Sequence, residues 1–515
     1  MMTFVPRPTD LADAIDAATK PHAIIIGSGF GGLAAAIRLG AKGYRVTVIE
    51  RLEQAGGRAS VFRQDGFTFD AGPTIVTAPF VFEELWALCG RNFAEDVDLR
   101  KMDPFYKIHF DDGRTFTVTD DPERMRAEIA KFNPDDLAGY ERYLKDSKAC
   151  YYVGFEGLGL IPFSKIRTML AALPRLGYLR ADRSVFGHAK KHIKDAQVRV
   201  ALSFHPLFIG GNPLRVTSVY CLIAYLEREW GVHFTMGGTG ALVQAMVDLM
   251  QDQGATLRLN QEVSEILVED GRACGVELAS GHRLYADIVV SNADPALTYG
   301  KLLPKKHIKR WSRKKIAKAH YSMSLFVWYF GTKKRYDAIE HHSLILGPRY
   351  EELLTDIFEN KVLAEDFSLY LHRPTKTDPS LAPEGCDAFY VLSPVPHLAS
   401  GTDWETAAEP YRQAIEKRLE ETIMPGLSSE IISSKMITPI DFRDRLQSYH
   451  GAAFGMEPRI TQSAWFRPHN RSEEVANLYM VGAGTHPGAG LPGVVTSAKI
   501  VAEMIPDAAI LNRKN

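Results

Sequence analysis

Residues 23–36 read Ala23-Ile24-Ile25-Ile26-Gly27-Ser28-Gly29-Phe30-Gly31-Gly32-Leu33-Ala34-Ala35-Ala36. The apolar, β-branched beginning predicts a buried parallel strand, and the Ala-rich end predicts a helix. Between them Gly27, Gly29 and Gly32 form a GxGxxG turn. The first glycine permits the tight turn, the second admits a pyrophosphate close to the backbone, and the third lets helix and strand pack closely. The helix N-terminus adds free N–H groups and a positive dipole end, so this stretch predicts a phosphate site.

A second strand is predicted over residues 44–49, and it ends in Glu50. That carboxylate follows the glycines by roughly 20 residues, where a ribose hydroxyl needs an acceptor. A GxGxxG alone is weak, because Gly-rich turns are common. Strand, glycines, helix, strand and acid in this order predict a Rossmann-type, dinucleotide-binding α/β fold.

The motif continues through Arg51 to Gly56-Gly57-Arg58, and then to Gly72-Pro73-Thr74. A Gly-Gly-Arg shortly after the acid resembles the extended FAD-binding signature of the glutathione reductase and amine oxidase superfamily. This resemblance implies FAD rather than NAD as the cofactor of the first site. Together with the motif it assigns cofactor contacts to Gly27, Gly29, Phe30, Gly31, Gly32, Glu50, Arg51, Gly57, Arg58, Gly72, Pro73, Thr74, Val263 and Asn292.

A second Gly-rich turn stands near the end of the chain. A strand is predicted over 477–482, a loop over 483–490, and a helix from Leu491, with Pro492 well placed in its first turn. The dipole of this helix would favour negative charge on a reduced isoalloxazine. We therefore expect the flavin end of FAD here, and the expected contacts are Gly484, Gly490, Leu491, Gly493 and Val494.

Composition limits the class of protein. The chain has 515 residues, of which 45% are hydrophobic and 24% charged, which describes a globular protein of two or three subdomains. The net charge of −1 gives no reason to expect nucleic acid. The five cysteines are scattered without a CxxC pair, so we expect no disulfide framework, no metal site and a reducing compartment.

The remaining pattern predicts a discontinuous arrangement. A leader is expected over 1–21, and the FAD-binding domain over 22–78, 236–295 and 441–515. An inserted α+β substrate domain is expected over 79–235 and 296–440, and its first part includes membrane-associating helices. The predicted strands in these parts are 105–110, 115–118, 255–259, 262–269, 273–279, 284–290, 324–330, 368–371 and 389–392. The predicted helices are 122–132, 135–150 and 240–253.

Longer pieces resemble a narrower family. They are residues 66–74, 226–232 (Leu-Glu-Arg-Glu-Trp-Gly-Val), 236–242 (Met-Gly-Gly-Thr-Gly-Ala-Leu), 462–470 and 482–490. Together they resemble the bacterial and fungal type of phytoene desaturase, and the similarity covers nearly the whole chain after the leader. The resemblance implies an FAD-dependent desaturase that converts phytoene towards neurosporene or lycopene. It also implies that FAD is reoxidised by a quinone or oxygen, and the sequence has no second strand-GxGxxG-helix unit for a nicotinamide.

No strong acid–base motif accompanies these pieces. The polar candidates for catalysis are Asp146 and Lys148 before Tyr151, His205, Glu229, and His486 in the C-terminal turn. A solvated helix face for the first two, and a satisfied core position for each histidine, are the ordinary alternatives. Four other functions stay open: desaturation of a later carotenoid, carotenoid cis–trans isomerisation, flavin amine oxidation, and carotenoid binding without catalysis.

A substrate dissolved in lipid requires contact with a membrane. Residues 157–194 hold eight Lys or Arg against a single acid, Asp182, and residues 301–318 hold nine and no acid. Basic amphipathic segments can lie in the interface of anionic lipid, with apolar side chains such as Leu160, Ile161 and Phe163 inserted. The longest apolar runs are too short to cross a bilayer. We therefore expect a peripheral protein on the cytoplasmic side of the cell membrane.

Overall fold

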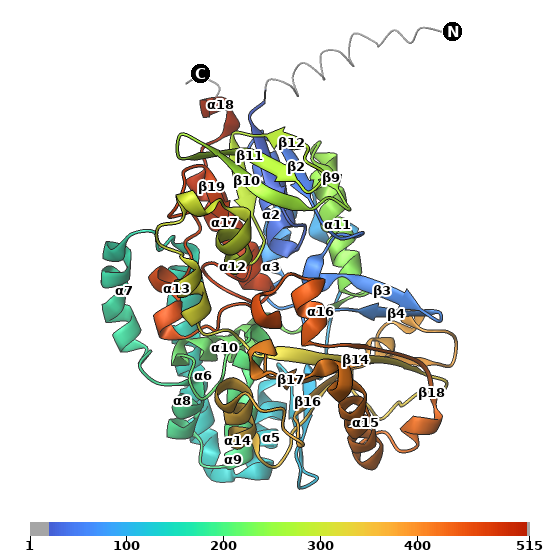
Figure 1. Cartoon of the computed structure of the whole chain (residues 1–515). Helices are drawn as coiled ribbons and strands as arrows, with labels where there is room; N and C mark the ends of the chain where they lie inside the picture. The colour runs from blue at the N-terminus through green and yellow to red at the C-terminus, as the bar shows by residue number, and fades with distance from the viewer. Residues whose placement is uncertain (1–19, 512–515) are drawn as a thin grey trace.

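The computed structural model describes residues 20–511. The predicted leader, 1–21, falls outside the described residues except for its last two positions. A five-stranded parallel sheet forms the upper part of the molecule in Figure 1, and its strand order is β19-β13-β1-β2-β9. These strands are β1 (His22–Ile26), β2 (Arg45–Ile49), β9 (Thr256–Arg258), β13 (Ile288–Ser291) and β19 (Leu478–Met480). Three distant segments of the chain therefore build one nucleotide-binding sheet.

Three helices pack together on this sheet. They are α2 (Phe30–Ala41), α11 (Thr239–Asp252) and α17 (Leu491–Met504), and α2 contacts both of the others. Ten of the twelve residues of α2 are buried, because this helix lies between the sheet and its neighbours. A helix that is apolar nearly all round belongs in such an interior. The N-termini of α2 and α17 consequently come close to each other at one edge of the sheet.

One predicted strand was wrong. Residues 284–290 were expected as a single strand of a hairpin, but they form two strands in different sheets. β12 (Arg283–Tyr285) pairs with β11 (Arg272–Leu278), which pairs with β10 (Val263–Glu269). β13 instead enters the parallel sheet beside β1. Its four residues are all buried, as expected for a strand covered on both faces.

A seven-stranded mixed sheet forms the second half of the molecule, with the order β18-β14-β17-β16-β15-β6-β7. Its strands are β6 (Tyr106–His109), β7 (Thr115–Val118), β14 (Ser324–Thr332), β15 (His342–Ile345), β16 (Leu369–His372), β17 (Asp387–Val395) and β18 (Ile431–Ile437). All nine residues of β14 are buried, and α15 (Trp404–Thr422) shares the apolar cluster on one face. Because β6 pairs with β15, both inserted parts of the chain contribute to this one sheet.

A layer of helices stands beside the second sheet, at the lower left of Figure 1. It contains α5 (Pro122–Phe132), α6 (Leu137–Cys150), α7 (Ile166–Tyr178), α8 (Val185–His192), α9 (Ala196–Ser203) and α10 (Leu222–Trp230). The helix α7 projects at the edge of the molecule (Figure 1). None of the helices between residues 20 and 511 combines the length and the apolar character that a membrane span requires.

Candidate active site

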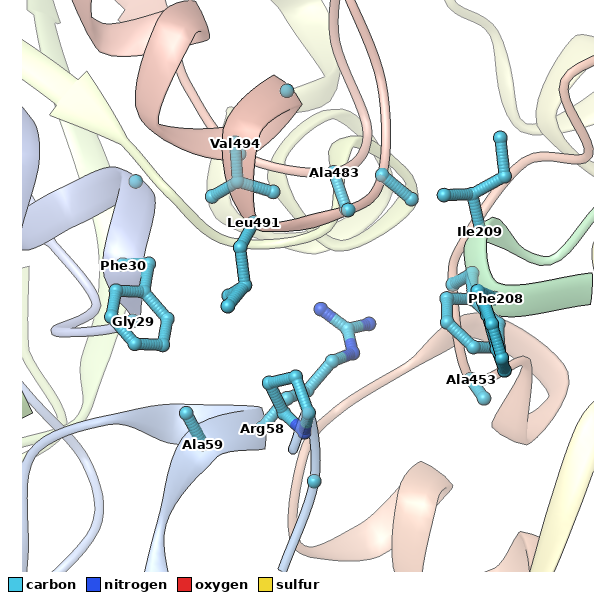
Figure 2. A pocket seen from close by; sticks show the side chains of 18 of the residues that line it. Gly29, Phe30, Arg58, Ala59, Phe208, Ile209, Ala453, Ala483, Leu491 and Val494 are labelled. Atoms are coloured by element: carbon cyan, nitrogen blue, oxygen red, sulfur yellow. The ribbon is translucent and has the colours of Figure 1, made fainter. Parts of the chain in front are cut away.

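A cavity of about 1010 Å³ runs from the glycine turns of the parallel sheet to the apolar side of the second sheet. Pockets for drug-sized ligands reach about 300–1000 Å³, so this cavity is at the upper end of that range. Figure 2 shows Phe30 of α2 and Leu491 and Val494 of α17 on one side of it. Phe208 and Ile209 stand across from them, and Arg58 points into the space between (Figure 2).

The first glycine turn has the geometry that a phosphate cradle needs. Gly27 has a φ of +91°, which disfavours residues that carry a Cβ. A Cβ on Gly32 would lie 2.0 Å from the carbonyl oxygen of Gly27, so only glycine allows α2 to pack this closely. Gly29 is the N-cap of α2 and lines the cavity. The free N–H groups of the first helical turn are thereby directed at the cavity.

Glu50 is buried at the end of β2 and lines the same cavity. Its Oε2 accepts hydrogen bonds from the backbone N–H and the hydroxyl of Ser28, both at 2.8 Å. Its Oε1 accepts the backbone N–H of Leu52 at 2.9 Å. The carboxylate is therefore held against the glycine turn, and its Oε1 keeps a further lone pair for a ribose hydroxyl.

Arg58 and Asp294 place opposite charges within the buried wall of the cavity. One guanidinium nitrogen of Arg58 donates to the hydroxyl of Ser448 at 2.9 Å, whereas its Nε has no partner among the described residues. Burial lowers the pKa of Arg58, and the charge of Asp294 opposes that shift. Burial likewise raises the pKa of the Asp294 carboxyl. A buried donor without a partner beside a glycine turn fits an anionic or polar ligand.

Asn292 joins the two Gly-rich turns. A Cβ on Gly31 would lie 2.6 Å from its Oδ1, and a Cβ on Gly482 would lie 2.5 Å from the same atom. The side chain of Asn292 thus fills the narrow space between β1–α2 and β19–α17. The two helix N-termini, each opening from a glycine, converge on one side of the cavity as a result.

The structure places nearly all of the predicted cofactor residues in the cavity wall. Two of them do not line it: Gly32 packs against Gly27, and Gly484 packs against Pro295, 2.1 Å from the Cβ that a larger residue would carry. Their roles are to allow close packing rather than to face a ligand. The others line the cavity, namely Gly27, Gly29, Phe30, Gly31, Glu50, Arg51, Gly57, Arg58, Gly72, Pro73, Thr74, Val263, Asn292, Gly490, Leu491, Gly493 and Val494.

The far end of the cavity is apolar. Side chains from β14, β15, β16, β17 and α10 surround it, and the main ones are Phe204, Leu207, Phe208, Ile223, Leu226, Met323, Leu325, Val327, Leu344, Leu369 and Leu392. The inner face of α7 adds Met169 and Leu176. Such a lining offers few hydrogen bonds, so it suits a hydrocarbon and excludes water.

One buried carboxylate interrupts the apolar part of the cavity wall. Glu227 of α10 is 3% exposed and lines the cavity. Its Oε2 accepts the hydroxyl hydrogen of Tyr106 at 2.9 Å, and Nε2 of His205 lies 3.3 Å from the same oxygen. Nε2 of His205 also lies 2.9 Å from the Tyr106 hydroxyl. Burial, followed by the charge of Glu227, raises the pKa of Tyr106 well above its usual value, so the phenol stays protonated and donates.

Three of the five predicted catalytic residues lie outside the cavity lining. Asp146 and Lys148 are on α6, outside the cavity lining, where Asp146 meets two histidines and Lys148 lies over the rings of Tyr152 and Tyr225. Glu229 is exposed and does not line the cavity. Lys148 and Glu229 are exposed helix positions, whereas Asp146 is half-buried beside the histidines.

The two predicted histidines are closer to the site. His205 does not line the cavity but contacts Glu227, which does. His486 lines the cavity, and its Nε2 donates to the carbonyl oxygen of Leu158 at 2.9 Å. Burial lowers the pKa of His486 to about 4, so its ring is neutral near pH 7. The ring therefore holds the loop at Leu158 against the C-terminal turn.

Sequence reasoning missed Glu227, although its helical period gives a signal. Ile223, Leu226, Glu227 and Trp230 recur at i, i+3, i+4 and i+7, which is one face of a helix. Glu227 is thus the acid on the apolar face of α10. Glu229 is on the opposite face.

The comparisons with known proteins agree with this site. Residues 30–506 match the family described as flavin containing amine oxidoreductase. A neurosporene-forming phytoene desaturase of Rhodobacter capsulatus is 53% identical over 95% of this chain and 94% of its own length. A lycopene-forming phytoene desaturase of Pantoea ananas is 48% identical over 93% and 98%. The chain belongs to the phytoene desaturase family.

Solved structures support the fold. A putrescine oxidase variant is 14% identical and superposes with a TM-score of 0.65 over 96% of this chain and 99% of its own. An oxidoreductase from Methanosarcina mazei gives a TM-score of 0.64 at 18% identity, over 94% and 100%. The predicted α/β fold with a Rossmann-type FAD-binding part is thereby confirmed. The chain is an FAD-dependent oxidoreductase, and the glycine turns, Glu50 and the unpartnered Nε of Arg58 fit that cofactor.

Proposed function

We propose that this protein desaturates phytoene, removing hydrogens from its saturated segments to extend the polyene towards neurosporene or lycopene. One observation carries the proposal: a single cavity joins the dinucleotide turns to a chamber lined mainly by aliphatic and aromatic side chains. A hydrocarbon substrate can therefore lie with one C–C bond next to the flavin end. The relatives at about half identity bear the name phytoene desaturase, which favours this substrate class.

In each step one carbon loses a hydride and its neighbour loses a proton, and a C=C bond forms between them. When bound, FAD supplies the hydride acceptor. We assign the proton to Glu227, because it is the buried carboxylate on the apolar face of α10 and lines the chamber. Tyr106 and His205 act as positioning residues, since their hydrogen bonds fix the orientation of its Oε2.

The helix α7 is the proposed membrane contact. On its outer face Ile166, Leu170 and Leu173 are each about half exposed to solvent, and Tyr178 is 78% exposed. Its inner face lines the cavity with Met169 and Leu176. A helix that is apolar on both sides and rich in basic residues suits the interface of a bilayer, and it would bring the lipid-dissolved substrate to the cavity wall.

The two predicted basic segments differ in the structure. Residues 301–318 are partly neutralised, because Lys301 pairs with Glu262 and Arg310 pairs with Glu473. In the first segment Arg180 pairs with Asp182, while Lys165, Arg167 and Arg175 are exposed around α7. The apolar contribution predicted for Phe163 was wrong, since this side chain is 3% exposed and packs against His486. The proposed surface is therefore α7 with its basic flanks, on the cytoplasmic side of the membrane.

We further propose a quinone or oxygen as the electron acceptor, because only one dinucleotide site is legible in the sequence. Turnover is then expected with quinone or oxygen and without NAD(P). Strict dependence on a nicotinamide would contradict this assignment.

The decisive experiment incubates the FAD-loaded protein with phytoene in liposomes and follows the polyene absorption and the products by chromatography. We expect red-shifted absorption from products with fewer hydrogens. Altered double-bond geometry without hydrogen loss would indicate an isomerase. Oxidation of amines without any effect on phytoene would indicate an amine oxidase, and bound but unchanged carotenoid would indicate a binding protein.

A further inference from the structure

A second cluster of polar side chains lies outside the cavity, between α6 and α8. Asp146 of α6 points at two histidines of α8, which are four residues apart in His188-Ala189-Lys190-Lys191-His192. Oδ2 of Asp146 is 3.1 Å from Nε2 of His192 and 3.3 Å from Nε2 of His188. One ligand atom from each of the three residues lies within 4.8 Å of the others. Residues at i and i+4 share one helix face, so both rings reach the same point.

We propose that Asp146, His188 and His192 bind a zinc ion. Two imidazoles and one carboxylate are ligands that zinc accepts, and they leave a fourth position for water. This inference is independent of the desaturase activity, because none of the three residues lines the cavity.

The distances agree with such a site. With zinc bonds of about 2.0–2.1 Å to nitrogen and about 2.0–2.2 Å to oxygen, tetrahedral ligand atoms are roughly 3.3–3.5 Å apart. The two distances from Oδ2 of Asp146 to the histidine nitrogens, 3.1 and 3.3 Å, fall at or just below that range. The third separation, between the two histidines, is at most 4.8 Å, so the rings would move together on binding the ion.

His188 gives the second, independent observation. It is 3% exposed, and neither of its ring nitrogens makes a hydrogen bond among the described residues, because Nε2 has only its 3.3 Å ion-pair contact with Oδ2 of Asp146. A buried nitrogen of this kind is unfavourable unless a ligand satisfies it. The Asp146 side chain is 41% exposed, which leaves a path for the ion and for a water at the fourth position.

Charge also bears on the choice of ligand. The carboxylate of Asp146 offsets part of a divalent charge, whereas Lys191, Arg142 and Arg183 lie close enough to oppose it. These cations weaken binding relative to a site in neutral surroundings. Another buried cluster, of three histidines at 341, 342 and 372, has no carboxylate, and a cation there would remain uncompensated.

The position suggests what the ion would do. Residues 151–184, which include α7, lie between Asp146 and His188 in the chain. A zinc ion bound by residues of both helices would hold α6 and α8 together, and these two helices flank the segment 151–184. Binding of an ion to the folded state alone stabilises that state.

The test measures zinc binding to the full-length, FAD-loaded protein after removal of metal by a chelator. Equilibrium dialysis with zinc chloride and metal analysis give the stoichiometry, and thermal unfolding gives the effect on stability. The variants are Asp146→Asn, which keeps the size of the side chain, and His192→Gln. His282→Gln, which removes an exposed histidine elsewhere, is the control.

We expect one zinc per chain and a higher Tm with zinc for the wild type and for His282→Gln. In both site variants the affinity should fall at least tenfold and the Tm shift should vanish, while FAD content and circular dichroism stay normal. No bound zinc in the wild type would overturn the proposal. Zinc bound equally well by Asp146→Asn and His192→Gln would also overturn it, because the ion would then lie elsewhere.

Discussion

At the scale of single residues, Glu50 both holds the glycine turn and keeps an acceptor oxygen for a ribose hydroxyl. In Glu50→Gln an NH₂ group replaces one of the two carboxylate oxygens. This group cannot accept a hydrogen bond, so the bond from the N–H of either Ser28 or Leu52 is lost. Hydrogen bonds to a charged group contribute about 1.5–3 kcal/mol, so the affinity for FAD should fall by roughly ten- to a hundredfold. Titration of the apoprotein with FAD, followed by flavin fluorescence, measures this. An unchanged dissociation constant would show that the carboxylate does not contact the cofactor.

Glu227 and Glu229 form a matched pair two positions apart on one helix. Loss of a positioned proton acceptor typically lowers the rate by about 10²–10⁴-fold. We expect a loss of that size in kcat for Glu227→Gln, with normal FAD content, and little change for the exposed Glu229→Gln. Phytoene turnover in liposomes is the measurement. Equal activities in the two variants would remove Glu227 from the reaction.

The glycine turns could be predicted from the sequence because their function is local. A GxGxxG turn, a helix and the following acid lie within about thirty residues, and their spacing alone defines the site. The partners of Glu227 could not be predicted in this way. Tyr106 and His205 are 121 and 22 positions away from it in the chain, and only the packing of β6 against the helical layer brings them together.

At the scale of elements, α7 shows how one helix can serve two surfaces. Replacing its outer side chains by serine in the triple variant Ile166→Ser, Leu170→Ser and Leu173→Ser should weaken binding to liposomes at least tenfold. Burial of an apolar side chain of this size contributes about 1.5–3 kcal/mol, and none of the three supports the interior. Co-sedimentation with anionic liposomes is the measurement, and FAD content should stay normal.

The matched control for α7 is Ile432→Ser on β18. Ile432 is 50% exposed, as the residues of α7 are, but lies on the other sheet edge. It should bind liposomes like the wild type. An equal loss of liposome binding in both variants would indicate non-specific hydrophobic adsorption. No loss of liposome binding in the triple variant would exclude α7 as the membrane surface.

Elements with a strong period were predictable, and their partners were not. The helix at 240–253 and the strand at 324–330 were confirmed as α11 and β14, because apolar spacing is a local property. The boundary between β12 and β13 was missed, since the two short strands are separated only by Ala286 and Asp287. Which sheet each strand joins depends on residues more than 200 positions away, such as His22, whose carbonyl accepts the N–H of Asp287.

At the scale of the whole molecule, three buried histidines tie stability to pH. His342 of β15 and His372 of β16 adjoin His341, which directly precedes β15, and a ring nitrogen of His341 lies 3.1 Å from one of His372. The hydroxyl of Tyr370 shares a hydrogen bond with Nδ1 of His342 at 2.7 Å. Burial lowers the pKa of all three, that of His342 to about 3 from an ordinary 6.5. The folded protein therefore keeps these rings neutral.

The sign of the pH dependence follows from these shifts. Above about pH 6.5 the rings are neutral in both states, and their burial does not depend on pH. As the pH falls from about 6.5 towards 3, these three histidines bind protons in the unfolded chain but stay neutral in the folded protein. Each such proton lowers the free energy of unfolding by about 1.4 kcal/mol per pH unit.

We expect the double variant His342→Gln and His372→Gln to lose stability less steeply than the wild type between about pH 6 and 4.5, when followed by urea unfolding at each pH. His282→Gln should keep the wild-type slope, because it removes an exposed histidine outside the cluster. A double variant with the wild-type slope would mean that other groups carry the acid sensitivity of the fold.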